Sequence, residues 1–134
     1  MLDLNVLLDV IQNRAPHYPA SAGVLSAARS GQFEAVIPAH AITTIFYLIE
    51  RANGRQTANQ SVDWLLQHFE IPATDRTIFL RARALSFGDF EDAVVAAIAE
   101  SRLCEYIVSR NSQDFAGSPV KTVSPEDFLG LLQV

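Results

Sequence analysis

The feature that most constrains the fold is the stretch from Phe87 to Phe115, where a helical pattern, a turn and a short strand follow one another. Apolar residues at helical spacing follow the polar opening Asp89-Phe90-Glu91-Asp92, and residues 105–109 then have the composition of a strand. The core-facing stripe of the predicted helix consists of Phe90, Ala93, Val94, Ala97 and Ile98. This pattern predicts a helix that packs on the strand directly after it.

Asp92 heads a second row on the same predicted helix. The apolar members of that row are Ala96, Ala99 and Leu103. A carboxylate that leads an apolar row is costly unless a cation, hydrogen-bond donors or water meets it. If the helix runs antiparallel to the strand, its first turn lies beside the strand's carboxyl end, where Asn111 and Asp114 follow. Open α/β sheets bind ligands at that edge, so we expect a functional site there.

The rest of the chain alternates between short apolar segments and helical patterns, which predicts a parallel α/β arrangement with right-handed crossovers. Short strands are expected at residues 1–3, 34–38, 71–74, 105–109 and 120–123. Further helices are expected from residue 4 to before Pro16, over 18–30, from Ala39 to Asn53-Gly54, over 56–68, after Asp75 to Leu85, and from Ser124-Pro125 onward. The expected fold is a three-layer α/β/α sandwich with a short-stranded, mainly parallel central sheet.

The composition limits the class of protein to which this chain can belong. The 134 residues are 49% hydrophobic and 19% charged, which fits a single folded domain over residues 1–134 and argues against disorder. Cys104 is the only cysteine, so an internal disulfide is excluded and no Cys/His zinc cluster is visible. The longest apolar run, 94–99, is too short to cross a bilayer. With no basic, apolar leader in view, a cytoplasmic protein is expected.

The net charge of −5, with Lys121 as the only lysine, argues against a general nucleic-acid binder. Any contact with nucleic acid would depend on a local group of arginines. The helix expected after Ala39 is apolar on more of its surface than one core contact requires. It is therefore either a central helix packed on two sides or part of a subunit interface.

Asp3, Asp92 and Asp114 each have a structural explanation as a helix cap or a loop residue. The predicted topology, however, brings all three to the same edge of the sheet. Carboxylates gathered at one edge repel one another, and a hard divalent cation with oxygen ligands relieves that repulsion. Together they predict a metal site.

Four segments of the chain, in order and spacing, resemble the PIN-domain (PilT N-terminus) nucleases, in particular the branch that includes the toxins of VapC-type toxin–antitoxin pairs. These segments are Asp3-Leu4-Asn5-Val6-Leu7-Leu8-Asp9, Asp89-Phe90-Glu91-Asp92-Ala93, Ser109-Arg110-Asn111-Ser112-Gln113-Asp114-Phe115 and Val123-Ser124-Pro125-Glu126-Asp127-Phe128-Leu129. The similarity runs nearly end to end and implies the PIN-like α/β fold.

The resemblance implies that Asp3, Asp92 and Asp114 bind Mg²⁺ or Mn²⁺ and are catalytic. It also implies that Asp89 and Asn111 support them, while Asn5 fixes the turn from strand to helix. The chain departs from the family at Thr44, where a Glu is usual, and at Leu4, where Ser or Thr is common. Without that Glu, one negative ligand is missing, which puts a second metal ion and full activity in question. Glu50 lies too far along the helix to replace it.

The activity that the resemblance implies is metal-dependent hydrolysis of RNA by an endoribonuclease. Such a protein would be a toxin that acts as a homodimer, with a small antitoxin as its partner. One metal ion can polarise the phosphate and activate water. Arg110 could contact a substrate phosphate, although a solvated arginine is the simpler interpretation. His17, His40 and His68 have no partners for nucleophilic catalysis and are interpreted as structural or surface residues.

Two alternatives stay open. Thr44 and the acidic net charge also fit a catalytically silent PIN-like domain that binds RNA or a protein partner. A receiver-type regulatory domain would likewise gather acids at the sheet edge, but it needs a lysine near the site, and Lys121 is the only one. Binding of Mn²⁺, or its absence, separates the first alternative from the nuclease.

Overall fold

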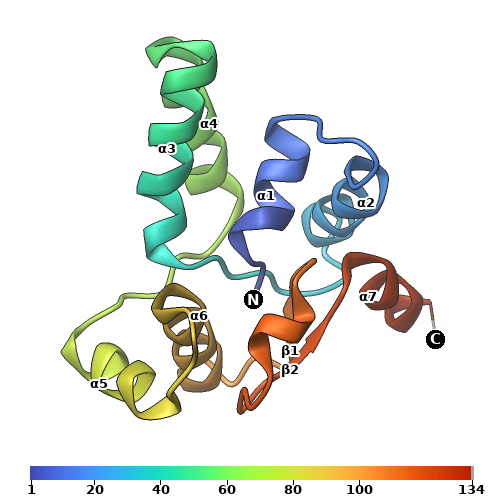
Figure 1. Ribbon diagram of the computed structural model, residues 1–134. Helices are drawn as coiled ribbons and strands as arrows, with labels where there is room; N and C mark the ends of the chain where they lie inside the picture. The colour runs from blue at the N-terminus through green and yellow to red at the C-terminus, as the bar shows by residue number, and fades with distance from the viewer. Residues whose placement is uncertain (134) are drawn as a thin grey trace.

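The computed structural model describes residues 1–133 and contains helices around a small parallel sheet (Figure 1). The α-helices are α1 (Leu4–Ile11), α2 (Tyr18–Arg29), α3 (Ala39–Asn53), α4 (Arg55–His68), α5 (Arg76–Leu85), α6 (Phe90–Ser101) and α7 (Pro125–Leu132). The strands are β1 (Tyr106–Val108) and β2 (Lys121–Val123), and a 3-10 helix, η1 (Ser112–Phe115), lies between them. Side chains of Asp75, Asp89 and Ser124 cap α5, α6 and α7 through the backbone N–H groups that begin each helix.

The sheet extends beyond its two regular strands because backbone hydrogen bonds add three short parallel segments. β1 pairs in parallel with β2 on one side and with the segment at Leu2 on the other. Leu2 N–H donates to the carbonyl of Val36 at 2.9 Å, and Ile37 N–H donates to the carbonyl of Glu70 at 3.0 Å. Neighbouring segments in the sheet therefore run in the order Glu70, Val36, Leu2, β1, β2.

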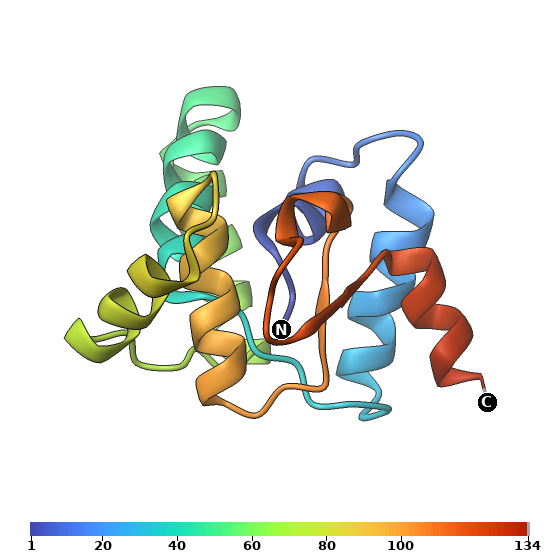
Figure 2. The same cartoon turned by 60° about the horizontal axis from the view of Figure 1, so that its bottom comes forward.

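Helices cover both faces of this sheet, as Figure 2 shows for α6 on one side and α2 and α7 on the other. Alternate residues of the central segments point to opposite faces: Leu2 and Val108 join the core shared with α1, α2 and α3, whereas Ile107 joins the core shared with α5 and α6. The expected α/β/α sandwich is thus confirmed. α3 and α4 form a hairpin that projects from the rest of the molecule (Figure 1).

Two of the expected strands are wrong in detail. Residues 34–38 contribute a single bridge at Val36, and the partner of Val36 is Glu70 rather than a residue within 71–74. Pro38 and Pro72 have no N–H to donate, so neither segment can continue a ladder. No helix among residues 1–133 is long and apolar enough to cross a membrane.

The two rows expected on α6 are also wrong in part, the core-facing stripe at Phe90 and the second row at Leu103. Residues Ala93 to Ala99 are all buried, so this helix is enclosed on every side rather than along one stripe. Phe90, by contrast, is 46% exposed, and Leu103 is 88% exposed in the turn after the helix, where its φ is 55°. The periodicity identified the helix correctly, but it could not show at which residues the packing of other elements against the helix ends.

Candidate active site

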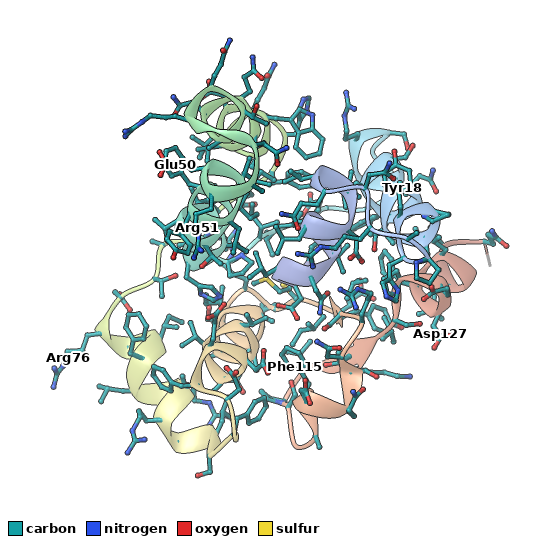
Figure 3. The ribbon with its side chains drawn as sticks, turned by 45° about the horizontal axis from the view of Figure 1, so that its top comes forward. Tyr18, Glu50, Arg51, Arg76, Phe115 and Asp127 are labelled. Carbon is teal, nitrogen blue, oxygen red and sulfur yellow. The ribbon has the colours of Figure 1, made fainter. Side chains whose placement is uncertain are left out.

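The carboxyl edge of the sheet brings together acidic residues that are far apart in the sequence. Asp3 ends the central segment and begins α1, Asp89 and Asp92 lie at the start of α6, and Asp114 lies in η1 after β1. The buried ring of Phe115 in η1 (Figure 3) packs on the loop before α6, because it meets the ring of Phe87 edge to face with centroids 6.2 Å apart. The expected convergence follows from this packing.

Asp3 is almost fully buried and is held by three donors. Its Oδ1 accepts from the N–H of Leu4 at 2.8 Å, and its Oδ2 accepts from the Ser109 hydroxyl at 2.8 Å and from Asn5 Nδ2 at 3.5 Å. Burial raises the pKa of Asp3, while the Ser109 hydrogen bond acts in the opposite direction. Since a carboxylate oxygen has two lone pairs, Oδ1 keeps one for a cation.

The side chain of Asn5 makes hydrogen bonds to the end of β1. Its Nδ2 donates to the Ser109 hydroxyl at 3.2 Å, and its Oδ1 accepts from the N–H of Arg110 at 3.3 Å. These bonds join the first turn of α1 to the end of β1. Ser109 itself was not predicted as a site residue, although a hydroxyl at the carboxyl end of a buried strand is a signal that could have identified it.

Asp92 has the most perturbed carboxyl group at this edge. Its pKa is raised from 3.8 to about 7, first because burial disfavours the charged form and then because Asp3, Asp89, Asp114 and Glu91 place negative charge around it. Near neutral pH this side chain is therefore poised between its neutral and ionised forms. A cation bound at this position would remove the repulsion that raises the pKa.

The remaining predicted residues occupy the rim of the site. Asp89 caps α6 by accepting from the N–H of Asp92 at 3.1 Å. Asn111 is exposed, and its N–H donates to the Ser109 hydroxyl at 3.1 Å. Asp114 is exposed in η1, near enough for its charge to act on Asp92. The structure thus brings together the five predicted residues Asp3, Asp89, Asp92, Asn111 and Asp114.

Two residues at this edge were missed by the sequence analysis. Glu91 and His40 both act electrostatically on Asp3, and His40 Nε2 lies 3.4 Å from Glu91 Oε1. His40 is therefore part of the surroundings of the site, whereas the sequence analysis interpreted it only as a structural or surface residue without a catalytic partner. Its position just after the segment at Val36, in the first turn of α3, was an available signal.

Arg110 and Thr44 are two further residues singled out in the sequence. The guanidinium of Arg110 donates through Nε to the fully buried carboxylate of Asp9 at 2.8 Å, which gives it a structural partner in place of the predicted phosphate. Thr44 lies one turn beyond His40 on the same face of α3 and is half-buried. Glu50 lies further along α3 (Figure 3). Its Oε2 lies 3.8 Å from Arg55 Nε.

The donor set at this edge suits a hard cation such as Mg²⁺ or Mn²⁺, because every candidate ligand is a carboxylate oxygen. Among residues 1–133, however, no three acidic, histidine or cysteine side chains lie close enough to hold one ion together. Mg²⁺ keeps several water ligands and often binds through one or two carboxylates. The arrangement therefore fits an ion held by one or two carboxylates and by water, and joint ligation by Asp3, Asp92 and Asp114 stays a prediction.

The chain matches a known protein family over most of its length. The model of the PIN domain family matches residues 1–113. The chain belongs to the PIN domain family. The matched residues include Asp3, Asp89 and Asp92 and end before Asp114. The resemblance that the four sequence segments indicated is confirmed.

The proteins that this PIN domain resembles include toxin–antitoxin proteins. Ribonuclease VapC1 of Aquifex aeolicus (strain VF5) is 21% identical over 132 residues, which cover 95% of this chain and 90% of that protein. A toxin–antitoxin complex from Klebsiella pneumoniae has a chain that matches with a TM-score of 0.70 and 22% identity, covering 92% of this chain and 95% of that chain. VapBC2 from Rickettsia felis, bound to a DNA fragment from its promoter, matches with a TM-score of 0.70 and 14% identity, covering 92% of this chain and 98% of that chain. At these identities the two structures support the fold.

Proposed function

We propose that this PIN domain is a metal-dependent endoribonuclease and the toxin of a toxin–antitoxin pair. The observation that carries the proposal is the gathering of acids at the carboxyl edge of the sheet, where burial and then the charges of the neighbouring acids raise the pKa of Asp92 to about 7. The similarity to Ribonuclease VapC1 supports RNA as the substrate. The similarity to chains of toxin–antitoxin complexes supports an antitoxin as the partner.

In this proposal Asp3 and Asp92 hold a Mg²⁺ or Mn²⁺ ion, and Asp114 binds it directly or through water. The ion supplies charge neutralisation for the phosphodiester and lowers the pKa of a water molecule. Asp3 is oriented for this role by Ser109 and Asn5, whose hydrogen bonds fix the carboxylate before any ligand arrives. Asp89 keeps one oxygen on the N–H of Asp92 and thereby fixes the first turn of α6.

Cleavage of RNA tests the proposal directly. The wild-type protein is expected to cleave a panel of single-stranded and structured RNAs in Mn²⁺, and cleavage is expected to stop in EDTA and in Asp92→Asn. Asp63→Asn is the matched control, because Asp63 is exposed on α4 and the substitution makes the same chemical change. No cleavage by the wild type across the panel, or equal cleavage by Asp92→Asn, would contradict the proposal.

The proposed oligomer is a homodimer, and the α3–α4 hairpin offers its contact surface. Tyr47 on α3 is 54% exposed and Leu66 on α4 is 55% exposed, although both are large apolar residues. Light scattering after size-exclusion chromatography measures the mass of the assembly. A mass equal to one chain at micromolar concentration would contradict the dimer.

A second candidate function is a catalytically silent PIN domain that binds RNA or protein. Thr44 favours it, because it stands where the family usually has a Glu, and so does the lack of a compact group of three ligands among residues 1–133. Such a domain would show no heat with Mn²⁺ in calorimetry and no increase in Tm on adding Mn²⁺. The nuclease is expected to show both.

A further inference from the structure

A pocket of about 630 Å³ opens directly beside the proposed catalytic edge. Its walls come from the start of α3, the segment before α5, α5 itself and the start of α6, and its lining residues are Ala39, His40, Thr74, Phe79, Phe90, Glu91 and Val94. Glu91 and His40 belong both to this pocket and to the surroundings of Asp3. A ligand in the pocket would therefore be a direct neighbour of anything bound at the acids.

Two exposed aromatic rings form one side of the pocket. Phe79 on α5 is 44% exposed and Phe90 on α6 is 46% exposed, with ring centroids 6.4 Å apart and planes inclined by only 24°. Aromatic rings exposed to this extent leave apolar faces in water, which a flat ligand could cover. Flat bases of single-stranded RNA are recognised in this way, by stacking on aromatic side chains.

The polar end of the pocket consists of His40 and Glu91, whose side chains suit the edge of a base. His40 Nε2 is buried and has no hydrogen-bond partner among residues 1–133, although it lies 3.4 Å from Glu91 Oε1. A carboxylate repels phosphate, but it accepts hydrogen bonds from the amino group of a base, as Glu and Asp do with N4 of cytosine. The polar end therefore favours a base with an exocyclic amino group over uracil.

We infer that this pocket, which we name the Phe79–Phe90 pocket, binds one nucleobase of the RNA, with preference for an amino-bearing base such as cytosine. The inference rests on the proposed ribonuclease activity for its choice of ligand. Stacking on Phe79 and Phe90 holds the base, and the Glu91 carboxylate accepts from its amino group. The phosphate next to that nucleotide is thereby placed at Asp3 and Asp92, which makes the pocket a determinant of the cleavage position.

Free nucleosides test the pocket without metal and without cleavage. Saturation-transfer NMR in EDTA is expected to show transfer from the protein to cytidine, and weaker transfer to uridine. In Phe79→Ala and Phe90→Ala the cytidine signal is expected to fall at least about fivefold. Leu80→Ala is the matched control, because Leu80 is 57% exposed on α5 but does not line the pocket, and its signal is expected to equal that of the wild type.

The same variants then test the role of the pocket in cleavage. With a cytidine-containing RNA decamer and Mn²⁺, kcat/KM is expected to fall about fivefold to a hundredfold in Phe90→Ala. Glu91→Gln, whose amide can also donate, is expected to bring the uridine signal closer to that of cytidine. If cytidine binds but the wild type cleaves no RNA, the result contradicts the proposed ribonuclease activity and still supports nucleobase binding in the pocket.

Three results would overturn the inference. They are the absence of transfer to cytidine in the wild type, equal transfer in Phe79→Ala and Phe90→Ala, and equal loss in Leu80→Ala. Light scattering of the same variants identifies the competing occupant. A lower assembly mass with an unchanged cytidine signal would assign the two rings to a contact between protein chains instead.

Discussion

Replacing Asp92 by Asn is expected to stabilise the protein when no metal ion is present. The pKa of Asp92 is about 7 in the folded protein against 3.8 for an ordinary aspartate. Because the folded state binds this proton more tightly, the free energy of unfolding decreases as the pH rises from about 4 to about 7, and it stays low above that range. The asparagine side chain of the variant carries no ionisable group, so the variant escapes this decrease.

The size of the effect follows from the pKa and from the exposure of the side chain. The difference in pKa would correspond to about 4 kcal/mol for a fully shielded group. Asp92 is only half-buried, and solvent screening reduces that value to about 1–2 kcal/mol. Loss of a negative charge in the first turn of α6 acts against the gain by about 0.5 kcal/mol. The expected net gain at about pH 8 is roughly 1 kcal/mol, or about 3–5 °C in Tm.

Urea and thermal unfolding in EDTA at about pH 8 and about pH 4 measure this effect. The gain from Asp92→Asn should be present at the higher pH and absent at the lower one, whereas Asp63→Asn should change stability by less than about 0.5 kcal/mol at both. In Mn²⁺ the order should reverse, because only the wild type gains metal-binding energy. A variant less stable than the wild type at about pH 8 in EDTA would refute the electrostatic reasoning.

Three further predictions concern residues around the acids. Ser109→Ala removes the buried hydroxyl that donates to Asp3 at 2.8 Å, so it should cost about 1–3 kcal/mol in urea unfolding and raise the pKa of Asp3 further; unchanged stability would contradict this. Arg110→Met leaves the Asp9 carboxylate buried without its cation and should lower the free energy of unfolding by about 3–5 kcal/mol. Adding Asp9→Asn should restore part of this loss. An Arg110→Met protein as stable as the wild type would show that the ion pair is unimportant. Thr44→Glu should raise Mn²⁺ affinity roughly tenfold in calorimetry, and an unchanged affinity would show that this position does not reach the ion.

The helices and the position of the acids at one edge of the sheet could be predicted because each depended on a local signal or on topology. Asp75 and Ser124 mark helix starts through side-chain caps, and the structure shows both. The gathering of Asp3, Asp92 and Asp114 needed only a parallel sheet, whose carboxyl ends share one edge. Accurate side-chain positions were not required for either prediction.

Other features depended on tertiary packing that local patterns do not contain. Phe90 has helical spacing with the buried residues of α6, yet it is 46% exposed and stacks with Phe79 of α5, which is itself 44% exposed. The partner of Arg110 is Asp9, a residue of α1 that carries no signal of its own within an apolar run. The role of His40 likewise depends on Glu91 at 3.4 Å, across two helices far apart in the sequence.

The most direct test of the account is the anomalous diffraction of a crystal soaked in Mn²⁺. The account predicts a single strong peak at the carboxyl edge of the sheet, within ligating distance of Asp92 or Asp3 and surrounded by water, and weaker or absent in Asp92→Asn. A crystal of the wild type with no peak at this edge, or with Mn²⁺ bound only elsewhere, would contradict it.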